Sequence, residues 1–201
     1  MSFNCEAAPT NWTALRVAFA HALDKDAIQQ QALGGFSRPV DSPIPPSMGL
    51  WSLDNHPDFV TNYYEPDPGT GNAILDAAGF VDVDSDGWRE DPNGNPINFS
   101  IVGANVNSTV IETVITFSIN AFNSLHIKTY PDLIDFNTLL LNIDNDDFNA
   151  VFMAFSLGGT DPLFLENFQS DAIANDWNFY NSTYDDLIDL SLIHISEPTR
   201  P

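Results

Sequence analysis

Between residues 97 and 155, segments with the pattern of strands alternate with segments that have the pattern of helices. The strand segments alternate apolar and polar residues or are apolar almost throughout, whereas the helical segments repeat apolar residues at spacings of three and four. In chain order they are a strand at 97–102, a helix at 110–122, a strand at 125–130, a helix at 136–143 and an almost wholly apolar strand at 148–155. This alternation predicts an α/β lobe in which the last strand is buried.

Two further helices are predicted near the start of the chain. In residues 15–24 (LRVAFAHALD), apolar side chains recur at every third or fourth position, and small alanines allow this face to pack closely. Asp24 has the character of an N-cap for a second helix at 25–33, and Gly34 ends that helix. The first of these helices is therefore expected to pack against the sheet.

The next part of the chain is rich in proline. Residues 38–51 (RPVDSPIPPSMGLW) are predicted to form an ordered surface loop, because proline fits neither a helix interior nor a central strand. Asp67 and Pro68 then begin another helix, which ends at Gly79. Gly71 is expected to weaken this helix by about 1 kcal/mol relative to alanine.

These segments resemble, in the same order, motifs of the family 5 extracellular solute-binding proteins, the dipeptide-, oligopeptide- and nickel-binding receptors of ABC importers. Residues 15–28 (LRVAFAHALDKDAI) match the helix signature V-R-x-A-x-x-x-A-[IL]-D-[RK]. Residues 35–46 match the passage G-x-x-x-P-x-x-S-P-I-P-P, and residues 64–80 match Y-D-P-x-x-A-x-x-L-L-x-x-A-G-[YF]. Residues 178–188 resemble the closing motif N-[FY]-x-x-[YF]-x-N-x-x-[FY]-D-x-L-[IL]. The resemblance covers about residues 12–189.

The resemblance implies an α/β fold, a periplasmic-binding-protein type II-like lobe that is incomplete, because full-length members are much longer and grip a solute between two lobes. It implies the substrate-binding component of an ABC importer. The implied partners are a small solute, peptide-like or other, and the permease subunits at the membrane. Members are extracytoplasmic, and the first nine residues lack the features of a signal peptide, so the natural N-terminus is expected upstream. No cofactor is expected, and the protein is expected to be a monomer.

The candidate site follows the predicted strand at 148–155, because ligands of open α/β sheets gather beyond the carboxyl ends of strands. Residues 155–168 (FSLGGTDPLFLENF) resemble the cleft-lining motif G-W-x-x-x-x-[DE]-P-x-x-[FL]. Peptide-binding members place an aspartate four residues before the proline and an aromatic residue seven before it. This chain has Gly158 and Phe155 there, which argues against amine-terminated peptides, although Phe155 can stack on an apolar or sugar face. The candidate substrate-binding residues are Phe155, Ser156, Gly158, Thr160 and Asp161; the alternative role of Asp161 is to cap the turn.

Residues 82–96 (DVDSDGWREDPNGNP) support a different hypothesis. Asp82, Asp84 and Asp86, followed by a glycine, reproduce the first half of a calcium loop. Asn93 stands at the twelfth position and cannot supply the bidentate carboxylate, so a turn without a metal is the favoured interpretation. The alternative function is an acidic, calcium-stabilised surface module with no transport role.

Charge narrows the classes of partner. Twenty-eight Asp and Glu against six Lys and Arg give a net charge of −22. A field of this sign repels nucleic acid, so no nucleic-acid partner is expected.

No nucleophile elbow is present and the histidines have no evident catalytic partners, so the chain is predicted not to be an enzyme. His126 stands where the family has glycine and is predicted to lie at an exposed strand edge.

The C-terminal residues 190–200 (LSLIHISEPTR) resemble the translation of a transposon mosaic-end sequencing adaptor, codon for codon. Together with Pro201 they are interpreted as library read-through and not as evolved protein. The predicted division is a partial lobe at 1–189 and a non-natural segment at 190–201.

Overall fold

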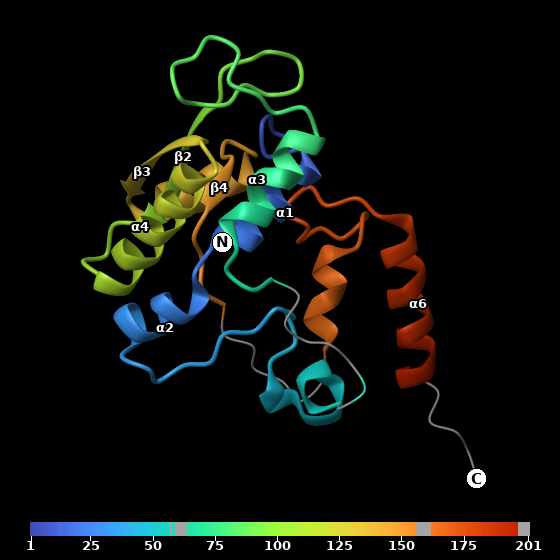
Figure 1. Ribbon diagram of the computed structural model, residues 1–201. Coiled ribbons are helices and arrows are strands. Elements are labelled where there is room, and N and C mark those ends of the chain that lie inside the picture. Colours follow the sequence, from blue (N-terminus) through green and yellow to red (C-terminus); the bar gives the residue numbers. More distant parts are fainter. Residues whose placement is uncertain (57, 59–63, 156–161, 197–201) are drawn as a thin grey trace.

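The structure, a computed structural model, describes residues 1–56, 58, 64–155 and 162–196 (Figure 1). Within these residues, four strands form one mixed sheet in the order β1-β4-β2-β3. The strands are β1 (Ser2–Phe3), β2 (Asn98–Ala104), β3 (Lys128–Ile134) and β4 (Ala150–Val151). β2 runs parallel to both β3 and β4, whereas β1 pairs antiparallel with β4 at the edge. The predicted α/β class is confirmed.

One face of the sheet is covered by α1 (Thr13–Ala22), α3 (Pro68–Ala77) and α4 (Thr109–Ser124). The centre of this core is aromatic: the ring of Phe122 stacks on Phe19 with centroids 4.5 Å apart and meets Phe99 edge-on at 5.3 Å. Ile101 of β2 and its register partner Ala150 of β4 are both fully buried in the same core. The face of α1 that the sequence predicted is therefore the face that meets the sheet.

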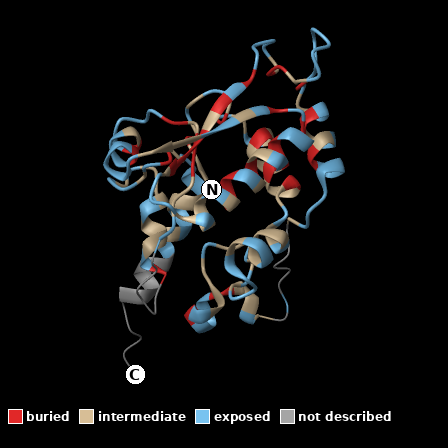
Figure 2. Ribbon diagram, turned by 90° about the vertical axis from the view of Figure 1, so that its left-hand side faces the viewer, coloured by how far each residue is buried: buried red, intermediate tan, exposed pale blue. Residues whose placement is uncertain are grey.

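The opposite face is covered by α5 (Phe136–Asp144) and by the segment around Trp177. Val102 and its register partner Val151 belong to this second core. Each follows a residue of the pair Ile101 and Ala150, which lies in the first core. Successive side chains of a strand point to opposite faces, so β2 and β4 contribute to both cores. Figure 2 shows the buried residues on the strands and on the helix faces that meet them.

The predicted helix caps are present. The Asp24 side chain accepts a hydrogen bond from the backbone N–H of Ala27 at the start of α2 (Lys25–Leu33), and Gly34 ends that helix with φ of 58°. The Asp67 carboxylate accepts bonds from the first turn of α3. Each cap satisfies backbone groups that have no partner within the helix.

Two short 3₁₀ helices that the pattern did not predict lie in and just after the proline-rich segment, η1 (Pro46–Trp51) and η2 (Leu53–Asn55). Another, η3 (Leu163–Phe168), and the helix α6 (Ser182–Ser196) complete the chain. Among the described residues, no helix combines the length and the apolar character needed to cross a membrane.

Two predicted strands differ from the structure. The strand predicted at 125–130 lies at Lys128–Ile134, and His126 is in the turn before it with φ of 59°. The prediction of His126 as a strand-edge residue is therefore wrong. The chain needs a left-handed residue to leave α4, which accounts for glycine in the family pattern.

The apolar segment predicted as a strand at 148–155 contributes only Ala150 and Val151 to β4. The N–H of Phe152 still donates to the carbonyl oxygen of Val102, and the chain then leaves the sheet. The apolar residues of this segment indicate that it is buried on both sides of the sheet. They do not indicate how many of its residues pair with a neighbouring strand.

Gly71 has a packing role that helix propensity does not predict. A Cβ atom at this position would lie 2.7 Å from Leu125 Cδ2 and 2.9 Å from the carbonyl oxygen of Ala18. The absence of a side chain therefore allows α3 to lie directly on α1.

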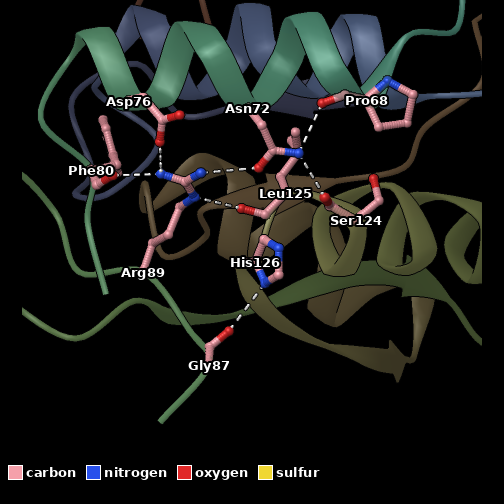
Figure 3. A network of polar contacts seen from close by, with 9 residues as sticks. All are labelled: Pro68, Asn72, Asp76, Phe80, Gly87, Arg89, Ser124, Leu125 and His126. Atoms are coloured by element: carbon pink, nitrogen blue, oxygen red, sulfur yellow. Dashed lines mark hydrogen bonds and ion pairs between the residues drawn. The ribbon is translucent and has the colours of Figure 1, made fainter. Parts of the chain in front are cut away.

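The loop between α3 and β2 is tied to the lobe by Arg89 (Figure 3). Its guanidinium donates to Asp76 Oδ1 at 2.6 Å, to the carbonyl oxygen of Phe80 at 2.5 Å and to that of Leu125 at 3.1 Å. Asn72 accepts another guanidinium bond at 3.1 Å and donates to the carbonyl oxygen of Ser124 at 2.9 Å. The side chain of Arg89 is 11% exposed. These bonds satisfy carbonyl groups where α4 ends and after α3 ends, and a cation is favoured at both places.

Replacing Arg89 with methionine keeps the aliphatic stem but removes the donors to Phe80 and Leu125. The Arg89→Met variant is expected to lose about 2–4 kcal/mol of unfolding free energy, because each unsatisfied buried polar group costs about 1–3 kcal/mol. Urea unfolding followed by circular dichroism measures this loss.

Lys128 supplies the control. It is an exposed cation at the start of β3. Lys128→Met is expected to cost less than about 1 kcal/mol, as for other exposed surface substitutions. Equal losses in the two variants would contradict the role assigned to Arg89.

Candidate binding site

An exposed aromatic ring stands where the chain leaves the carboxyl end of β4. Phe155 is 61% exposed, and its ring meets that of Trp177 edge-on with centroids 6.1 Å apart. Trp177 is 8% exposed and meets Phe148 with the same edge-on geometry, also at 6.1 Å. The ring of Phe155 thus packs against the buried indole of Trp177, while much of its own surface faces solvent.

Trp177 is a functional residue that the sequence reasoning missed. Its carbonyl oxygen accepts a hydrogen bond from the N–H of Cys5 at 2.9 Å, which ties the segment near 177 to the residues after β1. The available signal was a large aromatic residue within the polar stretch 174–178 (ANDWN). A tryptophan in such a polar stretch is a candidate for burial against a distant element.

A cavity of about 410 Å³, here called the end cavity, lies beyond the carboxyl ends of β2 and β4. It is bounded by the segment that leaves β4, by the loop after β2 and by the first turns of α4 and α5. Its lining includes Val106, Ser108, Phe136, Leu139, Phe152 and Met153. The described lining residues are apolar except for Ser108. Ala154 also lines the cavity and precedes Phe155, so the cavity and the exposed ring are adjacent along the chain.

A second cavity of about 450 Å³, here called the edge cavity, lies beside β1 and α1. Its lining includes Phe3, Cys5, Arg16, Ala20 and Trp177. The Arg16 guanidinium donates to the carbonyl oxygens of Thr10 and Asn11 and to the Thr13 hydroxyl, so it is held by the loop before α1. Burial raises the pKa of the Cys5 thiol, and this effect outweighs the opposing charge of Arg16.

The structure places one of the predicted contact residues. Phe155 is the exposed residue described above, whereas Ser156, Gly158, Thr160 and Asp161 lie outside the described residues. The chain resumes at Pro162, which precedes η3.

The aspartates of the loop at 82–86 bring their carboxylates close together. Asp82, Asp84 and Asp86 can each place a carboxylate oxygen within 4.8 Å of the others, and all three are exposed. Asp82 accepts bonds from the N–H groups of Ser85 and Gly87 at 2.7 and 3.0 Å. Asp84 and Asp86 each accept one further backbone N–H bond within the same loop. The carboxylates therefore accept backbone hydrogen bonds of the turn itself.

Comparison with known proteins extends these observations. Residues 1–176 match the family model described as bacterial extracellular solute-binding proteins, family 5 Middle. No curated protein matches the chain.

Several solved structures are similar to the chain. The oligopeptide-binding protein AppA from Bacillus subtilis, in complex with a nonapeptide, has a TM-score of 0.83 at 22% identity over 94% of this chain. A periplasmic oligopeptide-binding protein from Thermotoga maritima has a TM-score of 0.78 at 21% identity over 94% of this chain. NikA from Brucella suis, in complex with Fe(III)-EDTA, has a TM-score of 0.73 at 17% identity over 99% of this chain. At these identities the likeness shows the fold.

The chain spans only part of these relatives. It covers 37% of AppA, 37% of the Thermotoga maritima protein and 39% of NikA. The fold described above thus corresponds to about a third of each longer protein.

Alanine substitutions separate the structural aromatic residue from the exposed one. Trp177→Ala is expected to cost about 3–5 kcal/mol of unfolding free energy, because it empties a packed site. Phe155→Ala is expected to cost about 1 kcal/mol or less, which corresponds to one lost aromatic contact. Denaturant unfolding of both variants measures the difference, and a large loss for Phe155→Ala would show that this ring is structural.

Proposed function

Because the chain belongs to family 5 of the bacterial extracellular solute-binding proteins, we propose that it is part of the extracytoplasmic substrate-binding component of an ABC importer. The observation that carries the proposal is the family match over residues 1–176. The end cavity and the exposed Phe155 support it, since both lie beyond the carboxyl ends of parallel strands, where ligands of such sheets bind.

The chain would form one wall of the binding cleft. Since it covers 37% of AppA, the facing wall would come from the remainder of a longer protein. Closure of two walls around a solute excludes water and creates the form that a permease can recognise. The partners in this proposal are a small solute, peptide-like or other, and ABC permease subunits at the membrane, and the binding protein acts as a monomer.

The proposed contact residues are Phe155, Ser156, Gly158, Thr160 and Asp161. Phe155 would stack on an apolar or sugar face of the solute, since its ring is exposed and supported by Trp177. Gly158 leaves no carboxylate at the position where amine-binding relatives have one. The solute is therefore proposed to be something other than a peptide held by its free amino terminus.

A second candidate function rests on the convergent oxygens of Asp82, Asp84 and Asp86. It is an acidic surface module that calcium stabilises. Because each carboxylate already accepts backbone N–H bonds, the loop has a source of order that needs no metal. Calorimetric titration with calcium, together with melting in a chelator, separates the two functions: heat and a lower melting temperature in chelator would favour the module.

The proposed function is tested on the complete gene product. Recovery of the genomic locus is expected to show a second lobe, a leader and neighbouring permease genes. The complete protein is expected to bind a solute in a calorimetric or tryptophan-fluorescence assay against peptides and oligosaccharides. Phe155→Ala is expected to weaken that binding about threefold to tenfold, the equivalent of a lost aromatic contact.

Phe36→Ala is the control, because Phe36 is an almost fully exposed phenylalanine remote in sequence from the site. A locus that encodes only this lobe, with no companion segment, would overturn the transport function. If Phe155→Ala bound the solute with unchanged affinity, Phe155 would not be a contact residue. That result would not contradict the transport function.

We also propose that residues 190–201 are sequencing read-through and that the natural lobe ends near Asp189. Two contacts attach the described first half of α6 to the lobe: Tyr184 Oη donates to the carbonyl oxygen of Leu165 at 2.7 Å, and Asp189 accepts from Gln169 Nε2 at 2.9 Å.

A chain ending at Asp189 is therefore expected to melt at the temperature of the full chain in a calorimetric scan. A clear drop in melting temperature would show that the last twelve residues contribute to the fold. A genomic reading frame that continues through LSLIHISEPTR would refute the read-through directly.

A further inference from the structure

We propose that the end cavity receives an uncharged, apolar group of the solute, the size of an aromatic or branched aliphatic side chain. This inference deepens the proposed function and rests on it, because it assigns the chemistry of the solute that the lobe would bind.

The lining of the end cavity sets the charge of its occupant. Among its described lining residues, the side chains are apolar apart from the hydroxyl of Ser108. A carboxylate or ammonium group that entered would lose its hydration without an ionic partner, which is strongly unfavourable. An apolar group loses no hydrogen bonds and gains contacts with Phe136, Phe152 and Met153.

The depth of the cavity distinguishes it from a shallow apolar patch. Leu139 at its floor is 1% exposed and belongs to the second core, whereas Val106 and Phe136 at its rim are 54% and 46% exposed. The cavity therefore opens from the packed interior to solvent. Its volume of about 410 Å³ falls in the range of ligand pockets, about 300–1,000 Å³.

The charge of the whole chain excludes one further class of occupant. A net charge of −22 creates a field that repels anions from the surface. A cation would be drawn to the surface, but the described lining offers it no carboxylate. An uncharged group is neither repelled by the negative charge of the chain nor in need of an ionic partner in the cavity.

The position of the cavity connects it to the proposed contact residues. Ala154 lines the cavity, and the exposed Phe155 follows it in the chain. A solute that contacts Phe155 would therefore lie close to this cavity.

The test uses the full chain and the neutral fluorophore N-phenyl-1-naphthylamine. Saturable binding is expected, with an increase in fluorescence. Ser108→Asp is expected to weaken it at least about tenfold, because a carboxylate would then line the cavity. Ala154→Trp, which fills the mouth from an exposed position, is expected to weaken binding similarly.

Ala20→Trp is the matched control, because it fills the edge cavity with the same substitution. Its affinity for the fluorophore is expected to equal that of the unaltered chain. Benzyl alcohol is expected to displace the fluorophore, whereas phenylacetate and phenethylammonium, which carry the same ring with opposite charges, are expected to displace it poorly. Circular dichroism melting checks that each variant is folded.

Several outcomes would overturn the inference: no saturable binding, unchanged affinity in folded Ser108→Asp, loss of affinity only in Ala20→Trp, or equal displacement by the charged competitors. None of these depends on a second lobe or on a permease. Failure here is therefore distinguishable from failure of the transport function, which the genomic locus and the complete protein decide.

Discussion

Burial of both faces of β2 and β4 is the constraint on which the lobe depends. Ile101 and Ala150 pair in register within one core, and Val102 and Val151 pair within the other. A sheet buried on both sides needs helices on both sides, so its free surface is confined to the strand ends and edges. The exposed Phe155 and the end cavity lie at the carboxyl end, next to the second core.

Polar contacts attach the connecting segments to this sheet. Few of these contacts involve a Lys or Arg side chain. The chain has six Lys and Arg, and Arg89 and Arg16 each satisfy backbone carbonyl groups of more than one residue. Asp24, Asp67 and the aspartates near 84 accept backbone N–H bonds at helix starts and in a turn. Much of the acidity is therefore compatible with local structure, because carboxylates near helix N-termini are stabilising.

Features that depend on neighbouring residues were predicted correctly from the sequence. Features that depend on long-range contacts were not. The caps at Asp24 and Asp67 follow from residues within one helical turn, and so they were predicted in place. The αL turn at His126 and the two-residue length of β4 depend on where α4 must end and on how far β1 reaches along its neighbour. For the same reason Gly71 was predicted as a weak point, although the carbonyl oxygen of Ala18 requires the glycine there.

The sequence by itself determined the α/β class, the helix starts, the family resemblance and the position of Phe155 just after a buried strand. Each of these depends on the order and spacing of nearby residues. Tertiary structure alone decided that Trp177 supports Phe155, that Arg89 joins the ends of two helices, and that an apolar cavity opens beside α4 and α5. These features depend on residues brought together from distant parts of the chain, and their partners leave no periodic signal in the sequence.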